Sequence, residues 1–116
     1  MPDTLITVSY NYQNTPLDLR DRVALSDDEA LQIIEAAMEP SAGIKELAVV
    51  STCNRTEIYG VLVEPGHFYD WIIQQFLELK QIDLKQESVD PTIMYNNESV
   101  EHLFGVAGGL KSMMLG

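Results

Sequence analysis

Two β-branched, apolar runs that lie close together in the sequence constrain the fold most. Residues 47–50 (Leu-Ala-Val-Val) and residues 58–63 (Ile-Tyr-Gly-Val-Leu-Val) each have the composition of a buried strand, and only the polar segment 51–57 separates them. They predict two central strands, over residues 44–52 and 56–63. The second strand is expected to end at Pro65 and Gly66, because this pair favours a turn.

The rest of the chain alternates between helical and extended patterns. Ser26 and Glu29 have the spacing of a capping box, which predicts a helix that continues to about Met38. Apolar residues at helical spacing predict a helix over residues 67–80, in which Trp71 is interpreted as a core residue. The other expected elements are a strand over residues 5–10, short helices over residues 16–23 and 83–89, a last strand over residues 92–95, and a final helix from Glu98 onward with Asn97 as its cap. This order is typical of an α+β fold, a small antiparallel sheet covered by helices.

The final helix has two faces of different character. Its expected core stripe consists of Val100, Leu103, Phe104, Ala107, Leu110 and Met114. The opposite face carries His102, Gly105, Gly109 and Ser112. Because glycine has no side chain, this face would allow a substrate or a second backbone to approach closely. On the residues alone, an exposed and inert His102 is the favoured interpretation.

Cys53 is the only cysteine, and it lies among polar residues where a strand is expected to end. Arg55, two residues on in an extended stretch, would project from the same side. Its guanidinium could lower the pKa of the thiol or bind a substrate carboxylate through two hydrogen bonds. Thr52 and Asn54 add hydroxyl and amide groups that can orient a carbonyl or an amine. A turn with a structural cysteine remains the alternative.

Length and composition indicate one globular domain. The chain has 116 residues, 46% of them apolar, and no run approaches the roughly 20 apolar residues that span a bilayer. The start, Met1-Pro2-Asp3, lacks the basic residues of a secretory signal. We therefore expect a cytoplasmic protein without a membrane segment.

The net charge of −11 argues against nucleic-acid binding by electrostatics alone, since only seven Lys and Arg residues are present. Metal binding and dinucleotide binding have little support in the sequence. Cys53, His67 and His102 have none of the short spacings of a structural zinc site. The glycines at positions 105, 108 and 109 do not form the G-x-G-x-x-G pattern of a dinucleotide loop. We therefore predict no metal and no cofactor bound by these residues.

The cysteine segment is distinctive. Residues 51–59 (Ser-Thr-Cys-Asn-Arg-Thr-Glu-Ile-Tyr) resemble the signature of the glutamyl-tRNA reductase family, which catalyses the first step of C5 tetrapyrrole biosynthesis. Residues 16–23 resemble the segment that follows the first strand of that family, and residues 102–116 resemble the entry to its long central helix. The resemblance covers roughly residues 4–116 and implies a ferredoxin-like split βαβ sandwich.

The resemblance also implies a mechanism. Cys53 would attack the ester of glutamyl-tRNA to form a glutamyl thioester, which NADPH would reduce to glutamate-1-semialdehyde. Thr52, Asn54, Arg55 and Ser112 would position the glutamyl group, and His102 would assist proton transfer or orient the acyl group. The positive groups expected near the aminoacyl end are Arg20, Arg22, Arg55 and Lys111.

The resemblance further implies that residues 1–116 are an N-terminal catalytic domain from a longer chain, whose NADPH-binding and dimerisation domains lie elsewhere. We expect this part to be a monomer and the full-length protein to be a homodimer. The part alone is expected at most to form the thioester and then hydrolyse glutamyl-tRNA slowly to glutamate. The chain departs from the family pattern at residues 11–15, where a histidine and a lysine are common, and at Lys111, where an aspartate is common. Two other hypotheses remain open: a non-catalytic binding module with an inert Cys53, and a stand-alone thiol esterase in which Cys53 and His102 form a dyad.

Overall fold

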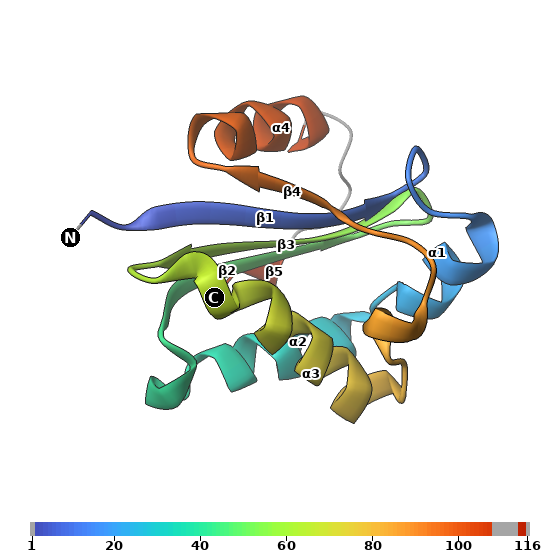
Figure 1. Ribbon diagram of the computed structural model, residues 1–116, viewed down its shortest axis with the longest axis horizontal. Helices are drawn as coiled ribbons and strands as arrows, with labels where there is room; N and C mark the ends of the chain where they lie inside the picture. The colour runs from blue at the N-terminus through green and yellow to red at the C-terminus, as the bar shows by residue number, and fades with distance from the viewer. Residues whose placement is uncertain (1, 108–113, 116) are drawn as a thin grey trace.

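The computed structural model describes residues 2–107 and 114–115, which form one antiparallel sheet with helices on both of its faces (Figure 1). The strands are β1 (Thr4–Asn11), β2 (Ile44–Ser51), β3 (Arg55–Leu62), β4 (Thr92–Tyr95) and the short β5 (Met114–Leu115). The helices are α1 (Leu17–Val23), α2 (Asp27–Ala37), α3 (Phe68–Lys80) and α4 (Asn97–Ala107). Three short 3₁₀ turns cover Pro40–Ala42, Pro65–His67 and Leu84–Gln86.

The sheet has the strand order β4-β1-β3-β2-β5, and every neighbouring pair is antiparallel. Strands β1 and β2 therefore run in the same direction with β3 between them. Helices α1 and α2 connect β1 to β2, and α3 connects β3 to β4. This is the ferredoxin-like split βαβ arrangement, so the expected α+β fold is confirmed.

The hydrophobic core lies between one face of the sheet and helices α2 and α3, which Figure 1 shows below the strands. Side chains alternate along β1, so Ile6, Val8 and Tyr10 join the core. Thr7, Ser9 and Asn11 are also buried but lie on the opposite face. Trp71 packs against the edge of the core and stacks on Phe68, as its interpretation as a core residue predicts.

Helix α2 begins at the predicted capping box. The Oγ atom of Ser26 accepts a hydrogen bond from the Glu29 amide at 3.1 Å, and the Glu29 carboxylate accepts one from the Ser26 amide at 2.9 Å. The box satisfies two amide donors that the first turn of a helix leaves without partners.

Helix α4 lies on the second face of the sheet, beside β4 and β1 (Figure 1). The predicted core stripe is wrong for this helix: Phe104 is 77% exposed and Val100 is also exposed. Ser99 is fully buried, and His102, Leu103 and Val106 are partly buried. The helix is rotated in this way because polar groups on the second face of the sheet need polar partners. Leu110 of the predicted stripe lies outside the described residues.

The helix start also differs by one residue from the prediction. Asn97 is the first residue of α4, and Asn96 precedes it with a positive φ of 51°. The Asn96 side chain accepts a hydrogen bond from the Leu5 amide at 3.1 Å, which joins the helix start to β1. None of the described helices combines the length and the apolar character that crossing a membrane requires.

Candidate active site

Cys53 lies in the tight connection between the two central strands. Strand β2 ends at Ser51 and β3 begins at Arg55, so Thr52, Cys53 and Asn54 form the turn. The turn is closed by a hydrogen bond from the Thr52 amide to the Arg55 carbonyl at 2.8 Å. Cys53 is therefore not in an extended stretch, and strand alternation does not place it relative to Arg55, contrary to the expectation. The thiol is exposed, as a nucleophile requires.

The Thr52 side chain serves the turn itself. Its Oγ1 atom accepts a hydrogen bond from the Asn54 amide at 3.2 Å. The Asn54 side chain is exposed. Both residues thus flank Cys53 at the sheet end, and part of the hydrogen-bonding capacity of Thr52 is used to hold the turn.

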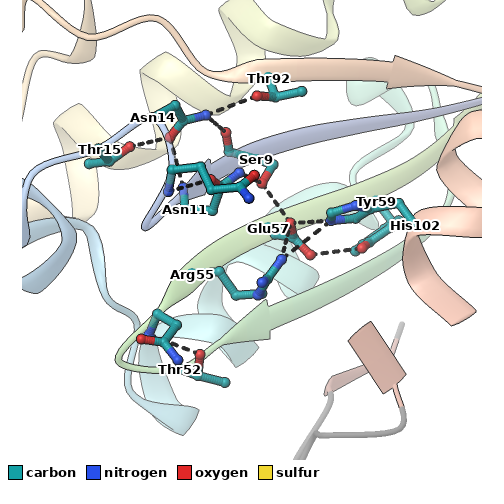
Figure 2. Close-up of polar contacts among 12 residues, drawn as sticks. Ser9, Asn11, Asn14, Thr15, Thr52, Arg55, Glu57, Tyr59, Thr92 and His102 are labelled. Atoms are coloured by element: carbon teal, nitrogen blue, oxygen red, sulfur yellow. Dashed lines mark hydrogen bonds and ion pairs between the residues drawn. The ribbon is translucent and has the colours of Figure 1, made fainter. Parts of the chain in front are cut away.

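The second face of the sheet carries a buried carboxylate, Glu57, that binds four side chains, and we call Glu57 and these four partners the Glu57 cluster (Figure 2). The Oε2 atom of Glu57 accepts hydrogen bonds from Ser9 Oγ at 2.6 Å and His102 Nε2 at 2.6 Å. Arg55 Nη1 lies 3.3 Å from the same oxygen. The Oε1 atom accepts a hydrogen bond from the Tyr59 hydroxyl at 2.8 Å. Glu57 is fully buried, so these donors replace the water that a carboxylate needs.

The sheet register explains why these groups meet. Ser9 is paired with Glu57 across β1 and β3. Arg55 and Tyr59 flank Glu57 at positions two residues away on β3, so all three side chains point to the same face. Helix α4 then brings His102 beside Glu57, as Figure 2 shows.

The Glu57 carboxylate also fixes the tautomer of His102. An ionised carboxylate only accepts hydrogen bonds, so Nε2 of His102 must carry a proton. Arg55 Nη1 lies 3.5 Å from Nε2, and this contact joins two donors that share one acceptor. In the neutral ring, Nδ1 is then the nitrogen with the lone pair.

The balance of burial and hydrogen bonding keeps Glu57 ionised. Burial favours the neutral acid and tends to raise its pKa, but hydrogen bonds from Ser9, His102 and Tyr59 outweigh burial and lower the pKa of Glu57 below its ordinary value of 4.5. Burial, together with the negative charge of Glu57, raises the pKa of Tyr59. Tyr59 therefore keeps its proton and acts as a donor.

A chain of polar groups extends from the Glu57 cluster to the turn after β1. Asn11 donates to Ser9 Oγ at 2.9 Å. The Asn14 side chain accepts a hydrogen bond from the backbone amide of Asn11 at 2.9 Å. It donates hydrogen bonds to the Ser9 carbonyl and to the Thr92 hydroxyl, at 3.0 Å each. Asn14, one of the departures from the family pattern, thus fastens the turn to β1 and β4.

The structure brings some of the predicted site residues together. Arg55 and His102 meet at Glu57, and Thr52, Cys53 and Asn54 directly precede Arg55 in the turn. Among the described residues, no hydrogen bond links the thiol of Cys53 to His102. Ser112 and Lys111 lie outside the described residues.

The two other expected positive groups lie on α1, at the same end of the sheet as the β2–β3 turn (Figure 1). Arg22 forms an ion pair with Glu87 at 2.9 Å. Arg20 is partly buried. The ion pair with Glu87 reduces the positive charge that Arg22 can offer to a phosphate.

Sequence reasoning missed the role of Glu57 and its partners Ser9 and Tyr59. A signal was present, because Arg55, Glu57 and Tyr59 alternate with the core residues of β3. A charged residue within a strand, at a position that alternates with buried ones, indicates a buried charge with dedicated partners. Those partners come from β1 and α4, which strand alternation alone does not reveal.

Comparisons with known proteins agree on one family. Residues 8–116 match the family described as the glutamyl-tRNA(Glu) reductase N-terminal domain. A glutamyl-tRNA reductase of Oceanobacillus iheyensis is 38% identical over 113 residues, which are 97% of this chain and 24% of that protein. A glutamyl-tRNA reductase of Bacillus subtilis is 35% identical over 114 residues, again 97% of this chain and 24% of that protein. The chain thus spans about a quarter of the length of the curated relatives it matches.

A solved structure supports the fold. The glutamyl-tRNA reductase from Methanopyrus kandleri superimposes with a TM-score of 0.59 and 22% identity, over 93% of this chain and 23% of that one. Since the family match covers almost all described residues and the relatives share more than a third of their aligned residues, the chain belongs to the glutamyl-tRNA reductase N-terminal domain family.

Proposed function

We propose that this chain is the glutamyl-accepting part of a glutamyl-tRNA reductase, with Cys53 as the nucleophile. The observation that carries the proposal is the exposed thiol in a turn that leads directly into Arg55, whose guanidinium is held by the buried Glu57 beside His102. An accessible thiol, a fixed guanidinium and an oriented imidazole are the groups that acyl transfer from a negatively charged donor requires.

The reaction at this site is an acyl transfer. The Cys53 thiolate attacks the carbonyl carbon of the ester that links glutamate to the terminal ribose of the tRNA. A C–S bond forms, the C–O bond breaks, and the ribose hydroxyl leaves with a proton. The products are a glutamyl thioester on Cys53 and free tRNA.

The other site residues have proposed roles in this step. Arg55 binds the side-chain carboxylate of the glutamyl group, because a guanidinium matches a carboxylate in both charge and shape. Thr52, Asn54 and Ser112 orient the acyl group. His102 moves a proton at Nδ1, the nitrogen that its hydrogen bond to Glu57 leaves with a lone pair.

The reduction step belongs to the longer enzyme. We propose that NADPH supplies its hydride there, in accordance with an oxidoreductase of this family. The described residues do not fit NADPH: among them, no strand leads into a glycine-rich turn at a helix start, the feature that holds a dinucleotide pyrophosphate. The steps assigned to this chain are therefore formation of the thioester and, without the reduction step, its slow hydrolysis to glutamate.

We propose that substrate binding is likewise divided between this chain and the other domains of the longer enzyme. The net charge of −11 disfavours tight binding of the tRNA phosphates. We therefore propose that this part binds the aminoacyl end while other domains bind the rest of the tRNA. We also propose that this part is monomeric by itself and that the full-length enzyme is a homodimer.

The proposal is tested by incubating this chain with glutamyl-tRNA, with and without NADPH, and measuring free glutamate and semialdehyde. We expect water to hydrolyse the thioester slowly and to release glutamate at equal rates in both mixtures, whereas Cys53→Ser should release no more than the spontaneous hydrolysis of glutamyl-tRNA without protein. Formation of semialdehyde by this chain with NADPH would contradict the division of steps. If alkylation of Cys53 leaves glutamate release unchanged, the thiol is not the nucleophile.

A parallel assay with p-nitrophenyl acetate separates acyl transfer from glutamyl-tRNA from a general thiol esterase. Hydrolysis of this simple ester as fast as that of glutamyl-tRNA would support the esterase instead.

A further inference from the structure

Tyr12 contacts the cysteine segment in two ways from the neighbouring strand end. Its backbone amide donates a hydrogen bond to the Asn54 carbonyl at 2.9 Å. The centre of its ring lies 5.9 Å from Cζ of Arg55, a distance at which a guanidinium over an aromatic face is attracted to the ring. Tyr12 therefore bridges the turn that carries Cys53 and the side chain expected to bind the substrate carboxylate.

The Arg55 side chain is constrained from two directions. Nη1 lies 3.3 Å from the buried Glu57 carboxylate, and the Cζ atom lies over the ring of Tyr12, 5.9 Å from its centre. The side chain is only 19% exposed. Among the described residues, the polar contacts of the guanidinium involve Nη1 alone, so Nε and Nη2 form the edge that can still bind a carboxylate through two parallel hydrogen bonds.

Because the contact with the Tyr12 ring uses none of the N–H donors of Arg55, it can restrain the guanidinium without competing for those donors. Removal of the ring would let the guanidinium rotate about the contact with Glu57. A carboxylate needs two aligned donors, whereas a neutral amide offers only one acceptor oxygen to the same edge. The orientation of Arg55 should thus matter more for a glutamyl group than for a glutaminyl group.

We propose that Tyr12 is a positioning residue that holds the Arg55 guanidinium in the orientation that selects a glutamyl over a glutaminyl group. This assignment rests on the function proposed above. It deepens that function by naming a residue that determines specificity without touching the reacting atoms.

The side chain of Tyr12 suits a substitution test because it is 54% exposed, so its removal leaves no cavity in the core. Tyr95 is a matched control, since it is 51% exposed and lies on β4. The three variants are Tyr12→Leu, Tyr12→Phe and Tyr95→Leu. The phenylalanine variant keeps the aromatic face and removes only the hydroxyl.

The first measurement is the ¹H–¹⁵N NMR signal of Arg55 Nε. An aromatic ring over the guanidinium shifts this proton signal upfield. We expect the shift to be lost in Tyr12→Leu and kept in Tyr12→Phe and Tyr95→Leu. An unchanged signal in Tyr12→Leu would overturn the contact itself, independently of any activity.

The second measurement is the single-turnover rate of Cys53 acylation at a range of concentrations, with glutamyl-tRNA and with the same tRNA charged with glutamine. We expect Tyr12→Leu to lower the preference for glutamate about three- to fivefold, the loss typical of an exposed cation–π contact. The change should appear in the half-saturating concentration of glutamyl-tRNA, with Tyr12→Phe and Tyr95→Leu close to the wild type.

The outcomes separate this assignment from the proposed function. If the wild type is acylated and Tyr12→Leu keeps its full preference, the assignment to Tyr12 is wrong while Cys53 remains the nucleophile. If Tyr12→Phe loses as much preference as Tyr12→Leu, the aromatic face is not the cause. If the wild type is not acylated by either tRNA, the proposed function fails, and the assignment to Tyr12 fails with it.

Discussion

The Nε2 atom of His102 lies 2.6 Å from Oε2 of Glu57, although 45 residues separate the two in the sequence. This contact joins α4 to the central strand β3 and orients the imidazole at the edge of the candidate site (Figure 2). The same oxygen accepts from Ser9, so one buried carboxylate connects β1, β3 and α4. The Glu57 cluster is thus both a structural link and the support of the site.

Replacement of Glu57 by glutamine should destabilise the protein. The amide group of glutamine would face donors on Ser9, Tyr59 and His102, and at least one of them would lose its acceptor. A buried donor without a partner costs about 1–3 kcal/mol. We expect urea unfolding at pH 7 to show a loss of this size for Glu57→Gln. The exposed Glu101 on α4 provides the control, and equal unfolding midpoints for Glu57→Gln and Glu101→Gln would contradict the role of the cluster.

The lowered pKa of Glu57 predicts a dependence of stability on pH. Because the pKa is lower in the folded than in the unfolded state, the ionised form stabilises the fold above the ordinary value of 4.5, and this contribution is lost as the pH falls through the folded-state pKa. The free energy of unfolding should therefore decrease below about pH 5, and less steeply in Glu57→Gln.

Glu29 contributes to the same acid sensitivity. The hydrogen bond from the Ser26 amide lowers its pKa, against a smaller effect of burial and with help from Lys80. Some dependence on pH should thus remain in Glu57→Gln. An identical slope in Glu57→Gln and the wild type between pH 5 and pH 3 would contradict the assignment to Glu57.

Gly60 is required by close packing between β3 and α3. A Cβ atom at this position would lie 2.6 Å from Cζ of Phe68, which is fully buried and has little room to move. Gly60→Ala should lower the free energy of unfolding by about 1–3 kcal/mol. Gly66→Ala is the control, because nothing lies within 4 Å of the added atom.

A second substitution tests the cause of the Gly60 effect. In a Phe68→Leu background the ring is absent, so Gly60→Ala should cost clearly less than in the wild type. A cost independent of Phe68 in this double-mutant cycle would show that backbone conformation, and not packing, requires the glycine.

The orientation of α4 can be tested with one exposed and one partly buried side chain. Phe104→Ser should change stability by no more than about 0.5 kcal/mol, because the ring is 77% exposed. Val106→Ser should cost more, since Val106 is partly buried. The stripe inferred from the sequence predicts the opposite order, so urea unfolding of the two variants decides between them.

The parts of the fold that local patterns determine could be predicted from the sequence. The two central strands follow from β-branched runs, and the start of α2 follows from Ser26 and Glu29, because a capping box involves only neighbours in the chain. The bounds of β2 and β3 differ from the prediction by one residue, since Thr52 belongs to the turn.

The face of α4 could not be predicted in this way. Helical periodicity selects the most apolar stripe, but the surface that α4 meets carries Ser9, Glu57 and Tyr59. A buried carboxylate makes it favourable to bury His102 and to leave Phe104 exposed. That preference depends on the contacts of Glu57 with His102, 45 residues away in the sequence, and with Ser9, 48 residues away. A local sequence pattern does not detect contacts over such separations.

The candidate site was predicted in part for a similar reason. The segment with Thr52, Cys53, Asn54 and Arg55 is contiguous, so its resemblance to one family located it. The Glu57 cluster that holds Arg55 and the nearby ring of Tyr12 depend on the fold, because the pairing of β1 with β3 brings them together with this segment.

The nucleophilic role of Cys53 is tested by rapid mixing of this chain with tRNA that carries radiolabelled glutamate, followed by an acid quench. We predict label on the wild-type protein that hydroxylamine releases, as it does from a thioester, and no label on Cys53→Ser. Equal labelling of the wild type and Cys53→Ser, or no label on either, would contradict Cys53 as the residue that accepts the glutamyl group in this chain.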